Sequence, residues 1–291
     1  MCHDITSYSS HISTYLSTIT NHHHPIMSSA KLIWITPEAE SQMVYCARVS
    51  NPKSQEEGKS PDRLIRYLAK HKHWSVFEMS SMCVEITTTR DIAAQILRHR
   101  SFSFQEFSQR YSSTDLLGLP MVPELRLQDK TNKQNSIVST DPLQLSELHQ
   151  FEGEIADFFE EAQDLYERLL DFGVAKECAR KVLPLQTPTR LYMAGTIRSW
   201  IHYLQIRCGV ETQLEHRQIA LAVMELFKEH LPTIYEALLC PQKSSSPPVK
   251  PVESLPLPPK APFIGKRLSG SFGWLGRLLT QYKALLPLRG L

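Results

Sequence analysis

Cations, hydroxyls and aromatic rings alternate within one short stretch of the chain, residues 95–112, which reads QILRHRSFSFQEFSQRYS. Large rings need a core to bury in, so their presence between the cations predicts that the cations are held at fixed positions. Arginine forks fixed beside hydroxyls can bind a phosphate or another multi-oxygen anion, because arginine donates two parallel hydrogen bonds. The polar groups of this proposed anion site are Arg98, His99, Arg100, Ser101, Ser103, Ser108 and Arg110.

Residues 95–112 also allow two other interpretations. The cations could form an arginine-rich helix face that Asp91 and Glu106 neutralise. Ser108 could be a nucleophile, but no His-Asp pair is spaced to activate it, so we interpret it as a phosphate-binding hydroxyl.

A metal site is a separate possibility in an earlier segment. His71, His73 and Glu78 could suggest zinc, but no further ligand pattern follows them, and no metal is predicted.

Composition sets the class of protein. With 291 residues and 42% hydrophobic content, the chain can bury a large core, and its central part fits one domain of about 200 residues. The net charge of +2 argues against a dedicated nucleic-acid binder. The six cysteines form no Cys-x-x-Cys pair, which indicates a reducing, cytoplasmic compartment.

The two ends of the chain differ from its centre. Residues 1–30 are rich in Ser, Thr and His and lack a secretory signal, so we expect a disordered lead. Residues 240–262 form a proline-rich linker. Residues 263–291 contain basic side chains, an apolar stripe and no acids, and could contact an anionic membrane surface, dock on a partner or stay disordered. No window reaches the length of a membrane span.

The hydrophobic periodicity predicts an α/β fold that positions the 95–112 stretch. A short apolar run predicts a strand at 32–35, and alternating apolar residues predict another at 80–88. Residues 51–62 are expected as a loop, and residues 118–142 as a loop or hairpin. Apolar residues three or four apart predict helices. The helices are expected over 43–49, 64–69, 92–98, 148–172, 174–183, 190–207 and 211–230.

The 95–112 stretch resembles the signature of the flavin-dependent thymidylate synthases, the ThyX family. That signature is Arg-His-Arg, seven residues, then Ser, and it matches residues 98–100 and Ser108. Glu106, Arg110 and Tyr111 match the family's usual extension of the motif. These matches favour the anion site over a solvated helix face.

Other segments carry the same resemblance, which covers roughly residues 31–239. Residues 179–184 resemble the family's Ala-Arg-x-Val-Leu-Pro, residues 198–207 its second conserved block, and residues 73–78 its His-x-x-x-x-Glu stretch. The chain departs from the family at Met79 and Glu211, where the family usually has histidines, so those two flavin contacts are not carried over.

The resemblance implies an α/β (α+β) fold with a mixed sheet surrounded by helices, in a homotetramer with shared active sites. It implies conversion of dUMP to dTMP with 5,10-methylenetetrahydrofolate as carbon donor and FAD reduced by NADPH. Arg207 is the expected catalytic residue, since a cation at the pyrimidine edge favours deprotonation at N3. The implied dUMP-binding residues are Gln95, Arg98, Glu106, Ser108, Gln109, Arg110, Arg180 and Arg207.

The flavin site implied by the resemblance draws on several separate segments, because a diphosphate needs cations and polar donors. Its residues are Ser50, His73, Ser75, Glu78, Arg98, His99, Arg100, Glu106, Arg198 and His202. Two alternatives remain open at this point. One is a nucleic-acid-binding module that uses the basic stretches, and the other is a flavin-binding protein that has lost catalysis.

Overall fold

The computed structural model describes residues 28–56 and 60–240. The expected N-terminal lead lies outside these residues apart from 28–30, as do the proline-rich linker apart from Cys240 and all of the basic tail. Within the described part, no helix is long and apolar enough to cross a membrane.

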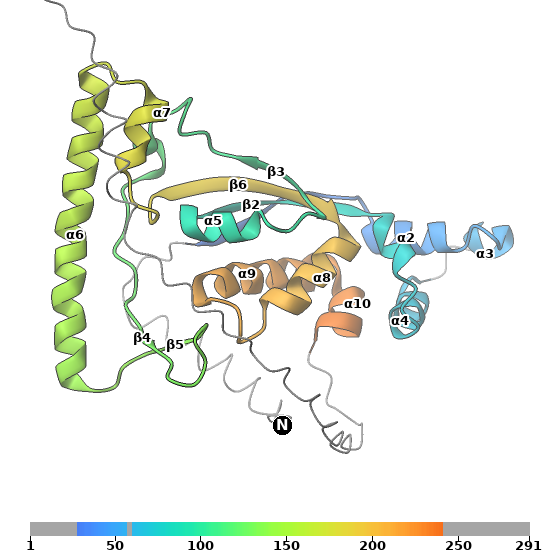
Figure 1. Cartoon of the computed structure of the whole chain (residues 1–291). Coiled ribbons are helices and arrows are strands. Elements are labelled where there is room, and N and C mark those ends of the chain that lie inside the picture. Colours follow the sequence, from blue (N-terminus) through green and yellow to red (C-terminus); the bar gives the residue numbers. More distant parts are fainter. Residues whose placement is uncertain (1–27, 57–59, 241–291) are drawn as a thin grey trace, which may run out of the picture. The chain divides into compact units, whose positions relative to one another are not determined.

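A four-stranded sheet in the order β1-β2-β6-β3 forms the centre of the fold (Figure 1). Its strands are β1 (Ser29–Ile35), β2 (Ser81–Thr89), β6 (Pro188–Thr196) and β3 (Ser103–Glu106). All three pairings are antiparallel, which corrects the expected mixed sheet. The expected α/β class and the strands at 32–35 and 80–88 are confirmed.

Strand β6 corrects the helix that was expected over 190–207, because only its second half is helical, as α8 (Ile197–Arg207). Leu191 and Met193 are fully buried while Arg190 and Tyr192 are exposed, which is the two-residue period of a strand. Leu191, Ala194 and Ile197 are spaced three residues apart, a spacing that is also typical of a helix. The pairing of β6 with strands on both sides decides its conformation.

Three helices pack beside the sheet: α5 (Arg90–Ile96), α8 and α9 (Leu214–His230). Figure 1 shows them on the same side of the strands. The indole Nε1 of Trp200 donates to the carbonyl of Met82 at 3.1 Å, which fixes α8 to β2. Burial of this apolar interface stabilises the elements that carry the 95–112 and 198–207 segments.

Shorter helices surround this core. The helix expected at 43–49 begins earlier, and a short helix replaces part of the loop expected at 51–62. These elements are α2 (Ala39–Ala47), α3 (Pro52–Glu56), α4 (Asp62–Lys70), η1 (Trp74–Glu78), α10 (Pro232–Ile234) and η4 (Tyr235–Leu239).

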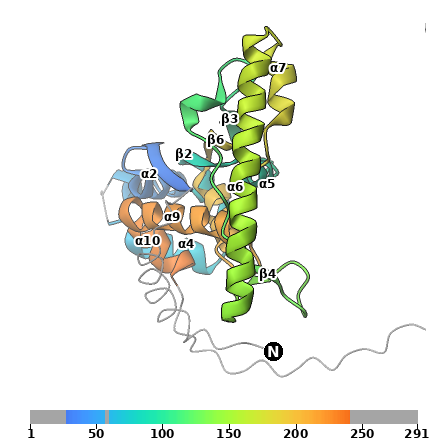
Figure 2. The same ribbon diagram turned by 90° about the vertical axis from the view of Figure 1, so that its left-hand side faces the viewer.

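The longest helix, α6 (Pro142–Asp171), contacts α7 (Lys176–Ala179) and η3 (Arg180–Val182), and α7 lies beside it in Figure 1 and Figure 2. It begins six residues before the expected start, because the Asp141 side chain accepts from the backbone N–H of Leu143 at 3.0 Å. The segment before it contains η2 (Thr114–Leu117) and the two-stranded hairpin of β4 (Leu127–Gln128) and β5 (Ser136–Ile137). The helix expected over 174–183 is confined to α7 and η3.

Gly195 lets the ring of Phe102 lie directly against β6. A Cβ atom at Gly195 would lie 2.5 Å from Cδ1 of Phe102, and that ring packs on Trp200 with centroids 4.8 Å apart. We expect Gly195→Ala to lower the free energy of unfolding by about 1–3 kcal/mol, as overpacking does. Thermal denaturation measures the loss.

Gly153 provides the matched control for this prediction, because nothing lies within 4 Å of a Cβ atom added there, in the exposed face of α6. Gly153→Ala is expected to raise the stability by about 0.5–1 kcal/mol through helix propensity. Equal melting temperatures of the two variants would contradict the close contact at Gly195.

Candidate active site

The 95–112 stretch begins in α5, turns at residues 97–102 and continues as edge strand β3. Phe102 and Phe104 are half-buried against the core, which confirms the prediction that aromatic rings anchor the cations. The two acids that could neutralise these arginines bond to other residues. Asp91 accepts a hydrogen bond from Thr89, and Glu106 accepts one from Thr189 at 3.0 Å. The interpretation as a neutralised arginine face is therefore wrong.

Three predicted anion-binding arginines keep their guanidinium groups available. Arg98 and Arg100 are exposed, Arg180 is half-buried, and none of the three forms an ion pair with another described residue. Unpaired guanidinium forks at fixed backbone positions suit a phosphate ligand. Arg110 differs, because it pairs with Glu177 at 3.0 Å.

The structure brings Arg207 and His99 together from segments far apart in the sequence. Arg207 lies at the end of α8, and its Nε donates to Nε2 of His99 at 2.9 Å. Gln95 lies four residues before His99 and donates to the side chain of Gln213, before α9, at 2.7 Å. The predicted catalytic arginine is thus connected directly to the Arg-His-Arg signature.

His99 is uncharged in this arrangement. Burial of the ring, with the nearby positive charge of Arg207 and with His202, lowers the pKa of His99 to about 4. A neutral ring leaves a lone pair on Nε2, which the donor Arg207 requires, and places the ring proton on Nδ1. His99 therefore acts as an acceptor toward Arg207 and not as a second cation.

A second group of predicted residues lies where α8 begins. Arg198 forms an ion pair with Glu78 at the end of η1. Ser75 lies on η1, His73 precedes it, and His202 follows Arg198 by about one turn of α8, with all three side chains exposed. The structure thus joins two segments that were predicted separately as flavin-binding.

A third group follows the end of β3. Gln109 is only 3% exposed, and its Nε2 has no hydrogen-bond partner among the described residues. Ser108 is exposed. Ser50, predicted for the flavin, is also exposed but lies in a separate segment, three residues after α2. A buried donor without a partner is costly, so Gln109 is a group that a ligand or another chain could satisfy.

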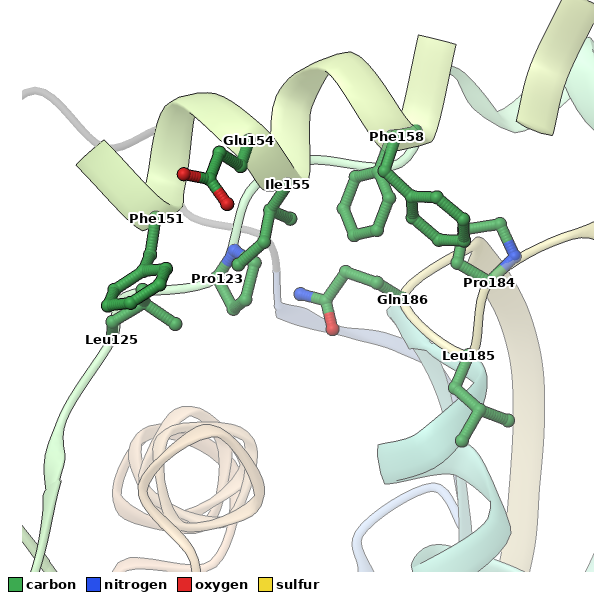
Figure 3. Close-up of a pocket in the computed structure, with 10 residues that line it drawn as sticks. Pro123, Leu125, Phe151, Glu154, Ile155, Phe158, Pro184, Leu185 and Gln186 are labelled. Atoms are coloured by element: carbon green, nitrogen blue, oxygen red, sulfur yellow. The ribbon is translucent and has the colours of Figure 1, made fainter. Parts of the chain in front are cut away.

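Two cavities formed by described residues lie away from these three groups. The larger cavity, of about 640 Å³, lies between α6 and two loops and is lined by Pro123, Phe151, Phe158 and Leu185 among others (Figure 3). The other, of about 350 Å³, lies around residues 35–41. Neither is lined by a predicted site residue.

Two features that involve α9 could not be predicted from the sequence. Arg126 pairs with Glu124 and Glu215 and so attaches the segment before the hairpin to α9, but no local motif marks it. His216 is fully buried, and its Nε2 lies 3.2 Å from the hydroxyl of Tyr203. The only signal for His216 was a lone polar residue on the apolar face of Ile219, Ala220 and Val223.

These observations define a class of protein. The described chain is an α/β protein with available guanidinium groups, exposed hydroxyls and a neutral histidine bonded to an arginine. That set of groups suits a nucleotide monophosphate together with a diphosphate-containing cofactor.

Comparison with known proteins identifies the family. The sequence profile described as "Thymidylate synthase complementing protein" matches residues 31–233. A probable flavin-dependent thymidylate synthase of Paramecium bursaria Chlorella virus 1 is 45% identical over 217 residues, which cover 72% of this chain and 98% of the viral protein. The flavin-dependent thymidylate synthase of Synechocystis sp. is 50% identical over 199 residues, covering 68% and 89%. The chain belongs to the flavin-dependent thymidylate synthase family.

A solved structure shares the fold. The crystal structure of the UMP/dUMP methylase PolB from Streptomyces cacaoi, bound with 5-Br dUMP, superposes with a TM-score of 0.62 and 28% sequence identity. The superposition covers 72% of this chain and 93% of PolB. The resemblance predicted from the Arg-His-Arg signature is confirmed.

Proposed function

We propose that this chain catalyses the reductive methylation of dUMP to dTMP, with 5,10-methylenetetrahydrofolate as carbon donor, FAD as cofactor and NADPH as reductant. The observation that carries the proposal is the hydrogen bond between Arg207 and His99 of the signature, beside arginines that have no described ion-pair partner. The names of the relatives and the dUMP analogue bound to PolB support the same reaction.

The dUMP site would use the groups on either side of the signature. Gln95, Arg98 and Arg180 would bind the phosphate and sugar with Ser108, Gln109 and Arg110, and Glu106 would accept from the nucleotide. Arg110 would have to exchange its bond to Glu177 for the substrate. Such an exchange costs little, because an exposed ion pair contributes only about 0–1 kcal/mol.

The hydrogen-bond donors and cations of the described residues are of the types that FAD requires. The second group supplies Arg198 and Ser75, and the signature supplies Arg100, so that cations and hydroxyls suited to a diphosphate are exposed. The remaining proposed contacts are Ser50, His73, Glu78, Arg98, His99, Glu106 and His202. When bound, the flavin supplies the reducing equivalents of the reaction.

Arg207 would act on the pyrimidine. A permanent cation beside N3 favours loss of the N3 proton, because a nearby positive charge lowers the pKa of an acid. The neighbouring cysteine does not offer an alternative nucleophile, since burial raises the pKa of Cys208 to about 12 and keeps it a thiol.

We also propose a homotetramer with shared sites, because the family resemblance implies one and the buried Nε2 of Gln109 has no hydrogen-bond partner among the described residues. The synthase domain would span residues 31–239, followed by the linker and the basic tail, in the cytoplasm. In this arrangement a neighbouring subunit completes each site.

The absorbance spectrum of the purified protein tests the proposed reaction. Added FAD should give bound flavin bands, which bleach with NADPH in the absence of air and recover only when dUMP and 5,10-methylenetetrahydrofolate are both present. Bound flavin that never recovers would support a protein that has lost catalysis. Absence of flavin binding at any FAD concentration would overturn the proposal and favour a nucleic-acid-binding role.

A further inference from the structure

A row of four side chains runs from the buried core to Arg207. His216 and Tyr203 are both 0% exposed, and the Tyr203 hydroxyl lies 3.2 Å from Nε2 of His216. The ring of Tyr203 lies edge-on to His99, with centroids 5.0 Å apart and an interplanar angle of 77°. His99 then accepts from Arg207 at 2.9 Å. The row therefore joins α9, α8 and the signature.

The hydrogen bond to His99 fixes the direction of the Arg207 guanidinium. It uses Nε, and this is the one hydrogen bond that the Arg207 side chain makes to a described residue. Both terminal nitrogens remain available for a ligand. An arginine held at Nε presents those two nitrogens in a fixed plane, so the angle of the His99 ring sets the angle at which they meet a substrate.

Packing alone gives no reason for a histidine at position 216. Its Nδ1 is buried without a described hydrogen-bond partner, and an apolar side chain would avoid that cost. Phe102 also lies edge-on to His99, at 6.4 Å and 86°, so aromatic rings confine His99 on two sides. The polar contact between His216 and Tyr203 thus restricts a tyrosine that confines His99.

We infer that His99, restrained by Tyr203 and His216, is a positioning residue that orients Arg207 toward the pyrimidine. This inference rests on the proposed function and adds to the flavin contact already proposed for His99. Tyr203 and His216 act only through the protein, because both are fully buried.

Tyr203→Phe in the FAD-loaded enzyme is the first test, since it keeps the ring and removes only the hydroxyl. We expect kcat to fall about 5-fold, the worth of one hydrogen bond, with the FAD content and the KM for dUMP unchanged. Tyr166→Phe is the matched control, because Tyr166 is also 0% exposed and its hydroxyl has no described partner. Its kcat should remain that of the natural enzyme.

His99 itself is tested by a conservative pair of variants. His99→Gln retains an oxygen that can accept from Arg207, whereas His99→Leu removes the acceptor. We expect His99→Leu to lose about 10-fold more kcat than His99→Gln, at matched FAD content. Equal losses in the two variants would overturn the inference.

A double-mutant cycle separates positioning from general stability. If Tyr203 acts through Arg207, then Tyr203→Phe has no further effect on kcat in the Arg207→Ala background. The same fold-loss in both backgrounds would overturn the inference while leaving the proposed function intact. His216→Gln provides a second variant should Tyr203→Phe lose FAD. A natural enzyme without dUMP turnover would overturn both the inference and the proposed function.

Discussion

Arg207→Ala is expected to lower kcat/KM for dUMP methylation by about 10²–10³-fold, the usual cost of removing one group that stabilises developing negative charge. The reason is the proposed contact with the pyrimidine, where the positive charge favours the N3 anion. Arg207 is half-buried and its terminal nitrogens have no described partner, so its charge is partly shielded from water and available to a ligand. Initial rates of dTMP formation, at matched FAD content, measure the loss.

Two further variants locate the source of this effect. Arg207→Lys keeps a charge but loses the planar fork and the bond to His99, so its activity should lie between that of the natural enzyme and that of Arg207→Ala. Arg217→Ala is the control, because Arg217 bonds to the carbonyl of Val210 and has no proposed role in the site. More than one tenth of the natural kcat/KM in Arg207→Ala would contradict the catalytic role of Arg207.

The sequence predicted the family and named candidate site residues, but it did not predict how those residues are arranged. The spacing of residues 98–100 from Ser108 is a local feature of the sequence and can be recognised without the tertiary structure. The family was predicted from this spacing, and the prediction is confirmed. The contact of His99 with Arg207 joins positions 108 residues apart, and no periodicity encodes such a distance. Arg207 could thus be named as a candidate from the sequence, but its contact with His99 could not be predicted.

The errors in the fold have a similar cause. Strand β2 alternates so regularly that its conformation is evident from sequence, whereas β6 has apolar residues compatible with both a strand and a helix. Pairing with β2 and β3 settles that conflict in favour of the strand. Edge strand β3 spans only four residues and pairs only with β6, so its pattern is too short to predict a strand from sequence. Both features required knowledge of which strands are neighbours.

Phe158→Glu on α6 is expected to dissociate the proposed tetramer and to release FAD with it. Phe158 belongs to the α6 apolar row, a set of four side chains spaced seven residues apart that share one side of the helix. They are exposed in the single chain: Phe151 by 54%, Phe158 by 56%, Leu165 by 38% and Phe172 by 88%. Phe151 and Phe158 also line the apolar cavity in Figure 3. Such a row in water is unfavourable unless another surface covers it.

The expected loss of subunit affinity follows from the apolar side chains that the α6 apolar row would bury. Burial of one phenylalanine contributes about 1.5–3 kcal/mol, and a buried carboxylate without a partner adds a further cost, so we expect subunit affinity to fall by at least about 10²-fold. Light scattering measures the mass, and absorbance measures the retained FAD. Gln150→Glu is the control, because it adds the same charge at an exposed α6 position outside the row. If Phe158→Glu keeps both its mass and its flavin, the α6 apolar row does not lie in a subunit interface, and the unsatisfied donor of Gln109 must be met by a ligand or by a subunit that approaches from another side.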